Sequence, residues 1–318
     1  MVLFLNISLF ILGLVFLSIS SNLLIKTSVR LAYLFKLTTL FIGLIFIAFG
    51  TSLPEATVSL LAVIKKYKDI ALGNIVGSNI ANIGLVLGLS GLIRPLRVDS
   101  SLFKREVPIM VLSSLFLYIF SLDGLISRGE GLVFLLSFIF FFIFAYKSSK
   151  LSEKKEFTPQ EFEASGAFKK LHSKALILIL FFLSLTFLLI GANMMVNSGV
   201  NVAKFFGISP WLIAITIFAI GTSLPELAAS LSASIKGVSS ISVGNVVGSN
   251  IFNILFVLGI ASLIRPIRLE SSILRFELPF LIFFSIIVSL FMRIKDNISR
   301  GEAGVLFLSY LVFIWRVI

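Results

Sequence analysis

An internal duplication constrains the fold of this chain more than any other feature. Residues 50–101 align with residues 221–272 without a gap, and 31 of the 52 aligned positions are identical. The likeness continues beyond this segment, from "REVP" at 105–108 to "FELP" at 276–279. Repeats of this kind mark repeated structural units, so we expect the two halves of the chain to fold alike.

The chain is too apolar for a soluble protein of its size. Of its 318 residues, 58% are hydrophobic and 13% are charged, and the mean hydropathy is +1.10, whereas soluble domains carry about 25% charged residues. Apolar stretches separated by short polar breaks predict ten transmembrane helices, since about 20 apolar residues cross a bilayer. The predicted helices are 2–25, 31–64, 70–92, 104–121, 128–147, 173–197, 207–235, 241–263, 273–292 and 301–318.

Five helices per half is an odd number, so the second half enters the membrane with reversed polarity. The predicted fold is an all-α polytopic membrane protein of two inverted-topology repeats, residues 1–147 and 173–318, in which helices 2 and 7 are interrupted. A charged linker, 148–172, joins them. Inverted repeats with interrupted helices are typical of secondary transporters, although duplication alone also fits a purely structural bundle.

The positive charges predict which side of the membrane each connection faces. Of the 27 Lys and Arg residues, 18 lie on the side opposite the N-terminus, including seven lysines from Lys147 to Lys174. Cytoplasmic loops are enriched in these residues, so we expect the N-terminus outside and the 148–172 linker in the cytoplasm. The net charge of +12 is therefore a topology signal, and nucleic acid is not an expected partner.

Each half carries the string "GTSLPE" inside its second predicted helix. A carboxylate at mid-membrane costs about 2.5–3.5 kcal/mol, so Glu55 and Glu226 are expected to face a partner, a cavity or an ion pathway. The proline before each glutamate removes the helical partner of the carbonyl four residues earlier, at Gly50 or Gly221. Opened backbone at this depth is tolerated beside a cavity or inside protein. The same string supplies the hydroxyls of Thr51, Ser52, Thr222 and Ser223.

A second string, "GNIVGSN" at 73–79 and "GNVVGSN" at 244–250, lies in the third predicted helix of each half. Its glycines have the small-xxx-small spacing that lets helices approach closely, which is a structural role. Its polar residues recur every four positions, so they share one helix face. We expect this stripe to line one side of a cavity. Its members are Asn74, Ser78, Asn82, Asn245, Ser249 and Asn253.

Together these groups predict a site for a hard cation. All of the candidate ligands are oxygen atoms, which suit Ca²⁺ and Na⁺ rather than zinc or copper. The chain has no cysteine, and its single histidine, His172, lies in the charged linker. One Ca²⁺ neutralises the two glutamates, as do two Na⁺ with a third held by neutral oxygens. We therefore expect a transporter of Ca²⁺ and Na⁺ rather than an enzyme, and no cofactor.

These strings resemble the motifs of the calcium/cation antiporter superfamily, especially prokaryotic sodium/calcium exchangers. The paired alpha-repeats of that family correspond here to residues 50–82 and 221–253, and they carry G-T-S-x-P-E and G-N-x-x-G-S-N in inverted five-helix halves. The resemblance implies exchange of three Na⁺ for one Ca²⁺, with the first and sixth helices sliding during alternating access. Its implied ligands are Glu55, Glu226, Asn82 and Asn253 at the centre, and Thr51, Ser52, Ser78, Thr222, Ser223, Ser249 and the carbonyls of Ala48 and Ala219 at the flanking sodium sites.

Asn82 and Asn253 depart from those relatives that carry an aspartate at one of these positions. The missing carboxylate lowers the site charge, removes a proton-carrying group and weakens the case for potassium dependence. Since Glu55 and Glu226 can themselves titrate, a Ca²⁺/H⁺ exchanger stays open as the alternative to Na⁺/Ca²⁺ exchange. A passive cation channel is a third, less favoured reading. We expect a multi-pass protein of the cytoplasmic membrane, in contact with the lipid bilayer and functional as a monomer.

Overall fold

The computed structural model describes residues 2–34, 48–98, 100–151, 173–235, 237, 239–295 and 297–318. Most of these residues are helical, and seven helices within them are long and apolar enough to cross a membrane. The chain is thus a polytopic helical membrane protein, as its composition predicts. Of the predicted linker 148–172, only the first four residues are described, at the end of a helix; the rest, with His172, lies outside these ranges.

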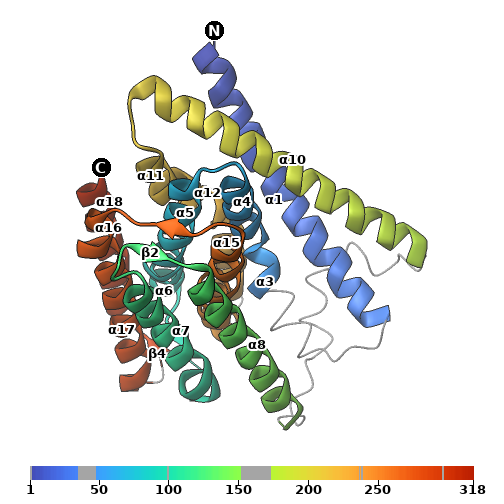
Figure 1. Ribbon diagram of the computed structural model, residues 1–318. Helices are drawn as coiled ribbons and strands as arrows, with labels where there is room; N and C mark the ends of the chain where they lie inside the picture. Colours follow the sequence, from blue (N-terminus) through green and yellow to red (C-terminus); the bar gives the residue numbers. More distant parts are fainter. Residues whose placement is uncertain are drawn as a thin grey trace.

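The first half follows the order of the predicted segments (Figure 1). Its third span is continuous, but a π-helical stretch interrupts the α-helix in the middle. The elements are α1 (Val2–Leu34), α3 (Ala48–Thr51), α4 (Leu53–Ile64), α5 (Lys68–Ala81), η2 (Asn82–Leu87), α6 (Gly88–Ile93), β1 (Leu96–Arg97), α7 (Ser100–Phe120), β2 (Leu125–Ile126) and α8 (Arg128–Leu151).

The second half repeats this order, including the π-helical stretch in the middle of its third span. In this half the start of the second span is also described, and it contains a further π-helical segment. Its elements are α10 (Lys174–Phe206), α11 (Pro210–Ile213), η4 (Ala214–Phe218), α12 (Ala219–Thr222), α13 (Leu224–Ile235), α14 (Ser239–Ile251), η5 (Phe252–Leu258), α15 (Gly259–Ile264), β3 (Ile267–Arg268), α16 (Ser271–Arg275), α17 (Glu277–Lys295), β4 (Asn297–Ile298) and α18 (Arg300–Val317).

The first helix of each half is longer than predicted. A break was expected after residue 25, but α1 continues to Leu34, because no glycine or proline occurs between residues 14 and 34 to stop it. The helix predicted over 173–197 continues to Phe206, where Gly207 in the left-handed conformation (φ 65°) ends it. Charged residues near these ends delimit the apolar span but do not end the helix.

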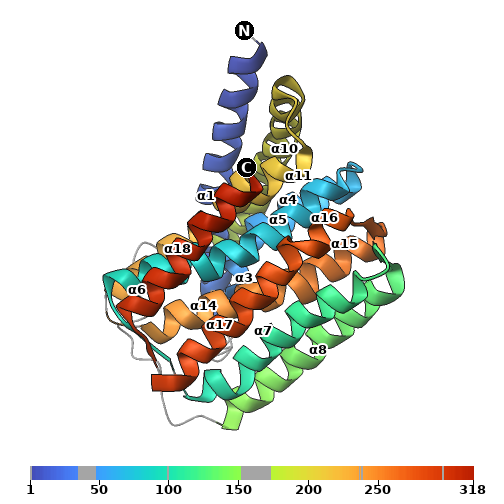
Figure 2. The same cartoon turned by 90° about the vertical axis from the view of Figure 1, so that its left-hand side faces the viewer.

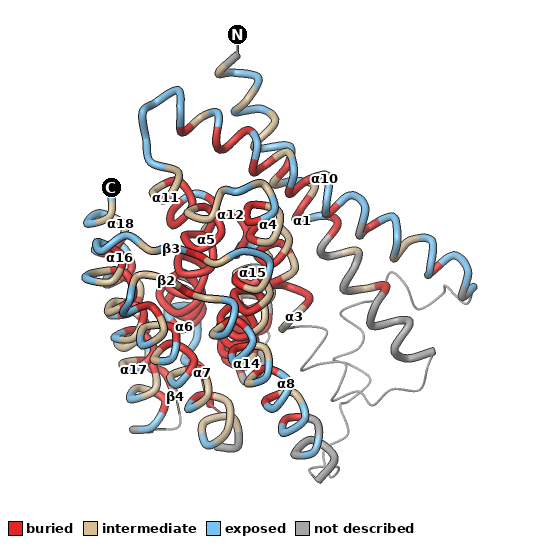
Figure 3. Tube along the Cα trace, viewed as in Figure 1, coloured by how far each residue is buried: buried red, intermediate tan, exposed pale blue. Residues whose placement is uncertain are grey.

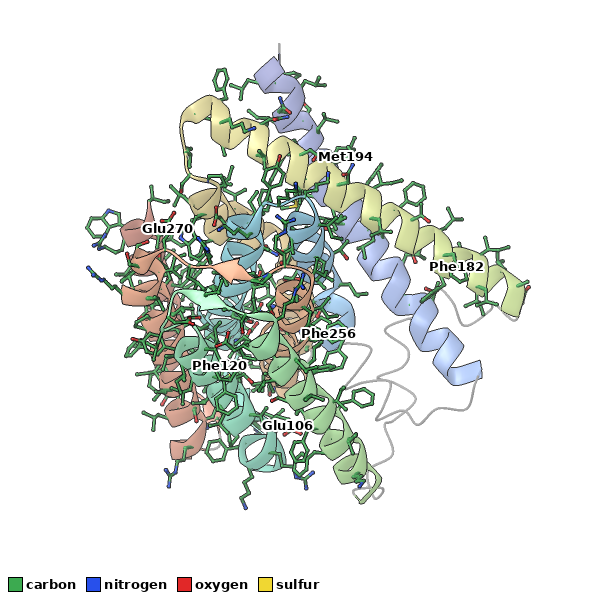
Figure 4. The ribbon with its side chains drawn as sticks, in the orientation of Figure 1. Glu106, Phe120, Phe182, Met194, Phe256 and Glu270 are labelled. Atoms are coloured by element: carbon green, nitrogen blue, oxygen red, sulfur yellow. The ribbon has the colours of Figure 1, made fainter. Side chains whose placement is uncertain are left out.

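Helices α1 and α10 pack against each other along one side of the bundle, where α10 also contacts α4 (Figures 1 and 2). They meet closely at two glycines: a Cβ on Gly13 would lie 2.8 Å from the Gly191 carbonyl oxygen, and the converse distance is also 2.8 Å. Much of their remaining surface is apolar and exposed, as at Phe182 on α10 (Figure 4). This surface suits contact with lipid.

The segments that carry the repeated strings form the buried centre of the molecule (Figure 3). Helix α5 lies directly on η4 and α12, because Gly73 and Gly77 have no side chains to hold them apart. A Cβ on Gly77 would lie 2.6 Å from the Ile215 carbonyl oxygen and 2.7 Å from the Ala219 Cβ. The close helix contact predicted from the glycine spacing is therefore present, and it brings the two strings together.

Two short antiparallel strand pairs join the halves, and neither was predicted. β1 pairs with β4, and β2 pairs with β3. By the repeat alignment β1 is equivalent to β3, since their positions differ by the same 171 residues as the two motifs. These equivalent strands nevertheless belong to different sheets. β2 and β3 lie together, away from the end of the bundle at which β4 lies (Figure 3).

Candidate cation site

Each copy of "GTSLPE" interrupts its helix, as predicted. Ser52 separates α3 from α4, and Ser223 separates α12 from α13. The following proline stands in the first turn of the new helix, where a missing N–H is tolerated. In the second copy, Pro225 has no N–H to offer the Gly221 carbonyl, and the Ser223 N–H donates to the Ala219 carbonyl at 3.1 Å. The breaks turn short polar segments toward the centre of the molecule.

The two glutamates follow these breaks and are both fully buried. Ser223 Oγ donates to Glu55 Oε1 at 2.9 Å, and Ser52 Oγ donates to Glu226 Oε1 at 2.8 Å. Each carboxylate is therefore held by a serine of the other half. Each serine stands three positions before the glutamate of its own half, so these crossed bonds bring the two carboxylates close together in the interior. Such a pair requires a compensating cation or proton.

Four buried oxygens at this centre have no hydrogen-bond donor among the described residues. They are Glu55 Oε2, Glu226 Oε2, Asn82 Oδ1 and Asn253 Oδ1. An unsatisfied buried acceptor costs about 1–3 kcal/mol, and more when it is charged, so native proteins leave few of them. A cation satisfies such acceptors without any donor. The four oxygens thus fit a cation-binding site.

A second set of hydrogen bonds links the threonines to asparagines of the opposite half. Thr51 Oγ1 donates to Asn245 Oδ1 at 3.0 Å, and Thr222 Oγ1 donates to Asn74 Oδ1 at 3.2 Å. Each asparagine amide donates in turn to the serine one helical turn beyond the glutamate of its own half. All of these groups are buried. The contacts hold the interrupted helix of one half against the third span of the other.

The two central asparagines lie where the third spans become π-helical. Asn82 is the first residue of η2, and Asn253 is the second residue of η5. π-Helical segments are rare and occur frequently at functional sites. Asn82 Nδ2 donates to Asn250 Oδ1 at 3.1 Å, and Asn253 Nδ2 donates to Asn79 Oδ1 at 3.5 Å. Here too, each half orients a side chain of the other.

The remaining predicted site residues lie around this centre. Ser78 Oγ lies 3.4 Å from the Thr222 hydroxyl oxygen, and Ser249 is buried in α14. Ala48 lies in α3 and Ala219 lies in α12, the segments that carry the threonines. The structure therefore brings the predicted residues into one region.

Four buried polar residues next to the site were not predicted to belong to it. Asn79 and Asn250 fall outside the stripe of every fourth residue, and Ser59 and Ser230 follow the glutamates by four positions. A signal for all four was present, because each pair is identical in the two copies of the repeat. Their partners in the opposite half could not be read from spacing.

The site offers oxygen ligands of three kinds, which are carboxylate, amide and hydroxyl. Among the described residues, no three or more His, Cys, Asp or Glu side chains lie together so that they could hold a metal ion, so the two glutamates supply the negative charge of this site. Calcium binds six to eight oxygens of this kind, and its charge balances two carboxylates. Chemically, the arrangement can hold one divalent cation, or monovalent cations distributed around the two glutamates.

The family described as sodium/calcium exchanger protein matches residues 5–147 and 176–318, which is most of the chain. The chain belongs to this family. Among the related sodium/calcium exchangers is "Sodium/calcium exchanger MaX1" of Methanosarcina acetivorans, which is 32% identical over 97% of each chain. "Putative antiporter CaxA" of Alkalimonas amylolytica is 38% identical over 82% of this chain and 81% of that protein.

A solved structure of the sodium-calcium exchanger NCX_Mj matches with a TM-score of 0.69 and 32% identity, over 98% of each chain. Family membership confirms the resemblance that the motifs indicate. Because sodium/calcium exchangers are transporters, it also confirms that the chain is a membrane transport protein and not an enzyme. It does not by itself assign the counter-ion or the ligands in this chain.

Proposed function

We propose that the protein exchanges Na⁺ for Ca²⁺ across the cytoplasmic membrane, with the ions bound near the midplane between Glu55 and Glu226. One observation carries the proposal: each glutamate keeps one fully buried oxygen without a donor, beside equally unpartnered oxygens of Asn82 and Asn253. A divalent cation neutralises the two carboxylates. The names of MaX1 and NCX_Mj support Na⁺ as the counter-ion.

In this proposal the four unpartnered oxygens form the central position, which Ca²⁺ occupies. The serines that hold the glutamates serve two purposes, because a hydroxyl that donates its hydrogen to a carboxylate still has oxygen lone pairs for Na⁺. The central ligands are Glu55, Glu226, Asn82 and Asn253, and the flanking sodium ligands are Thr51, Ser52, Ser78, Thr222, Ser223, Ser249 and the carbonyls of Ala48 and Ala219.

Antiport follows from the sharing of these oxygens. The same carboxylates cannot hold the calcium and sodium loads together, so the two loads exclude each other. When the site is empty, two buried charges remain uncompensated, and a conformational change that carries them through the low-dielectric interior is costly. Only the loaded transporter then changes access readily, which couples the two ion flows.

The proposal includes ten transmembrane helices in two inverted repeats, residues 1–147 and 173–318. The strand pairs support it: inverted halves put equivalent loops on opposite sides of the membrane, and β1 and β3 are equivalent but lie in different sheets. The α1–α10 pair meets closely at Gly13 and Gly191. Small residues leave a smooth contact, which suits sliding of these two helices during alternating access.

We further propose that the N-terminus lies outside, that the 148–172 linker lies in the cytoplasm, and that the monomer is the functional unit. The charge distribution supports the orientation, and the ion ligands of both halves come from one chain. A relative named "Inner membrane protein YrbG" of Escherichia coli, 32% identical over 96% of this chain and 95% of that protein, supports the membrane assigned.

The test is a gradient-driven flux assay in proteoliposomes. Vesicles loaded with Na⁺ and diluted into Na⁺-free buffer are expected to take up ⁴⁵Ca²⁺, whereas vesicles loaded with choline are not. Uptake of equal size from choline-loaded vesicles would contradict sodium coupling, and flux in the absence of any counter-ion would indicate a channel.

Proton-coupled Ca²⁺ exchange is the second candidate. It is favoured by the proximity of two buried carboxylates, because protons as well as cations relieve their repulsion. This reading predicts that a pH gradient drives ⁴⁵Ca²⁺ uptake in vesicles that contain no sodium. Uptake that requires sodium at constant pH would contradict it.

A further inference from the structure

Nothing in an asparagine side chain itself decides whether the oxygen or the NH₂ group of its amide faces the ion, so this choice depends on neighbouring residues. An asparagine amide can turn by 180° about its terminal bond, which exchanges an acceptor for a donor at each position. In the turned state, Asn82 would direct an NH₂ group at the cation and repel it. The site therefore requires a contact that keeps the Asn82 carbonyl oxygen inward.

Asn250 makes that contact from the third span of the other half. Its Oδ1 accepts from Asn82 Nδ2 at 3.1 Å, and a turned Asn82 would set two acceptors against each other. Asn250 is itself anchored, because its Nδ2 donates to the main-chain oxygen of Asn79 at 3.2 Å and lies 3.9 Å from Met110 Sδ. A main-chain carbonyl can only accept, so it holds the Asn250 amide in one orientation.

The contacts thus run in one direction, from the Asn79 main chain through Asn250 to Asn82 and the ion. We propose that Asn250 is a positioning residue that keeps Asn82 Oδ1 turned toward the transported cation. Asn250 does not touch the ion itself, and its effect is transmitted through Asn82. This inference rests on the proposed function, since it concerns the orientation of one of its ligands.

The equivalent contact in the other half lacks this anchor. Asn79 Oδ1 accepts from Asn253 Nδ2 at 3.5 Å, and Asn79 Nδ2 has no hydrogen-bond partner among the described residues. Nothing there sets the orientation of the Asn79 amide, so it holds Asn253 less firmly. The two halves are alike in sequence, but one central amide is oriented more strictly than the other.

A structural role for Asn250 is the competing explanation, because its contacts with the Asn79 main chain in α5 and with Met110 in α7 do not involve Asn82 and also stabilise the packing of α14. The two roles differ in what they predict for Asn82. A positioning residue acts on ion affinity through Asn82 alone, whereas a packing residue lowers stability whether or not Asn82 is present.

The experiment measures ⁴⁵Ca²⁺ binding to the purified full-length protein. Asn250→Leu is expected to raise the Kd for Ca²⁺ about tenfold, as for the loss of one buried hydrogen bond between neutral groups. Asn79→Leu is the matched control at the equivalent position; it leaves the main-chain anchor of Asn250 in place and is expected to raise the Kd no more than about threefold. Equal effects of the two substitutions would overturn the proposal.

A double-mutant cycle separates positioning from packing. In an Asn82→Ala background, Asn250→Leu is expected to leave the Kd unchanged, since there is no amide left to orient. Losses that multiply would overturn the proposal. Should Asn250→Leu fail to fold, Asn250→Ala removes the same contacts without added bulk and carries the same prediction. Absence of Ca²⁺ binding to the wild-type protein would instead overturn the proposed function, and this inference with it.

Discussion

Ser52 Oγ donates to Glu226 Oε1 at 2.8 Å, although 174 residues separate the two positions in the chain. The mirrored bond from Ser223 to Glu55 has almost the same length, 2.9 Å. Neither half of the protein therefore contains the whole candidate cation site: each supplies one carboxylate and the hydroxyl that bonds to the other. The repeated residues therefore come together only when the two halves pack face to face.

Glu55→Gln is expected to abolish sodium-driven calcium uptake, with a loss on the order of 100-fold, which corresponds to about 2.7 kcal/mol. The substitution removes one of two site charges and exchanges an unpartnered oxygen for a donor. Stability should not fall, because the repulsion between the two glutamates is removed as well. Uptake of ⁴⁵Ca²⁺ in proteoliposomes and thermal unfolding in detergent measure the two effects. Glu270→Gln, at an exposed carboxylate, is the control; a similar loss there would show that the effect is not specific to the site.

Ser52→Ala is expected to weaken Ca²⁺ binding about tenfold, since a hydrogen bond to a charged group contributes about 1.5–3 kcal/mol. The measurement is the Kd for ⁴⁵Ca²⁺. Ser121→Ala is the matched control, because Ser121 is equally buried but bonds to the Leu117 carbonyl oxygen in the preceding helix, α7. If Ser52→Ala still weakens binding tenfold in a Glu226→Gln background, the hydroxyl does not act through that carboxylate.

Gly77→Ala is expected to destabilise the protein by about 1–3 kcal/mol, because the added methyl group cannot be accommodated against η4. Its Cβ would lie 2.6 Å from the Ile215 carbonyl oxygen. Gly301→Ala makes the same chemical change where no atom lies within 4 Å of the new Cβ, so stability should be unchanged or slightly higher. Thermal unfolding of both variants tests the contact, and equal midpoints would refute it.

The proposed orientation can be tested by labelling, because the chain contains no cysteine of its own. A cysteine introduced by Ser152→Cys in the linker is expected to react with a membrane-impermeant maleimide only in inside-out vesicles. A cysteine introduced by Asp123→Cys, between α7 and β2, is expected to react only from the outside of the membrane, in intact spheroplasts. The opposite pattern would reverse the topology, and labelling of both positions from one side would exclude an odd number of crossings between them.

Much of the fold and most of the site could be predicted because the determining features are local. Apolar runs predicted the helical segments, Pro54 and Pro225 predicted the breaks, and the repeated strings supplied the site residues. The end of α1 was predicted wrongly, since Lys26 and Arg30 mark an end of the apolar span but do not stop a helix. The π-helical segments were missed because they have no composition of their own.

The sequence by itself determined which chemical groups lie at the centre of each half, because residue identity and helical spacing are properties of a short stretch of chain. Only the tertiary structure decided their partners: that Ser52 holds Glu226, that Asn250 holds Asn82, and that β1 joins β4. These pairings depend on distances between segments far apart in the sequence, which are set when the two halves pack. Because the halves carry nearly the same strings, spacing alone could not distinguish a bond within one half from a bond between the two.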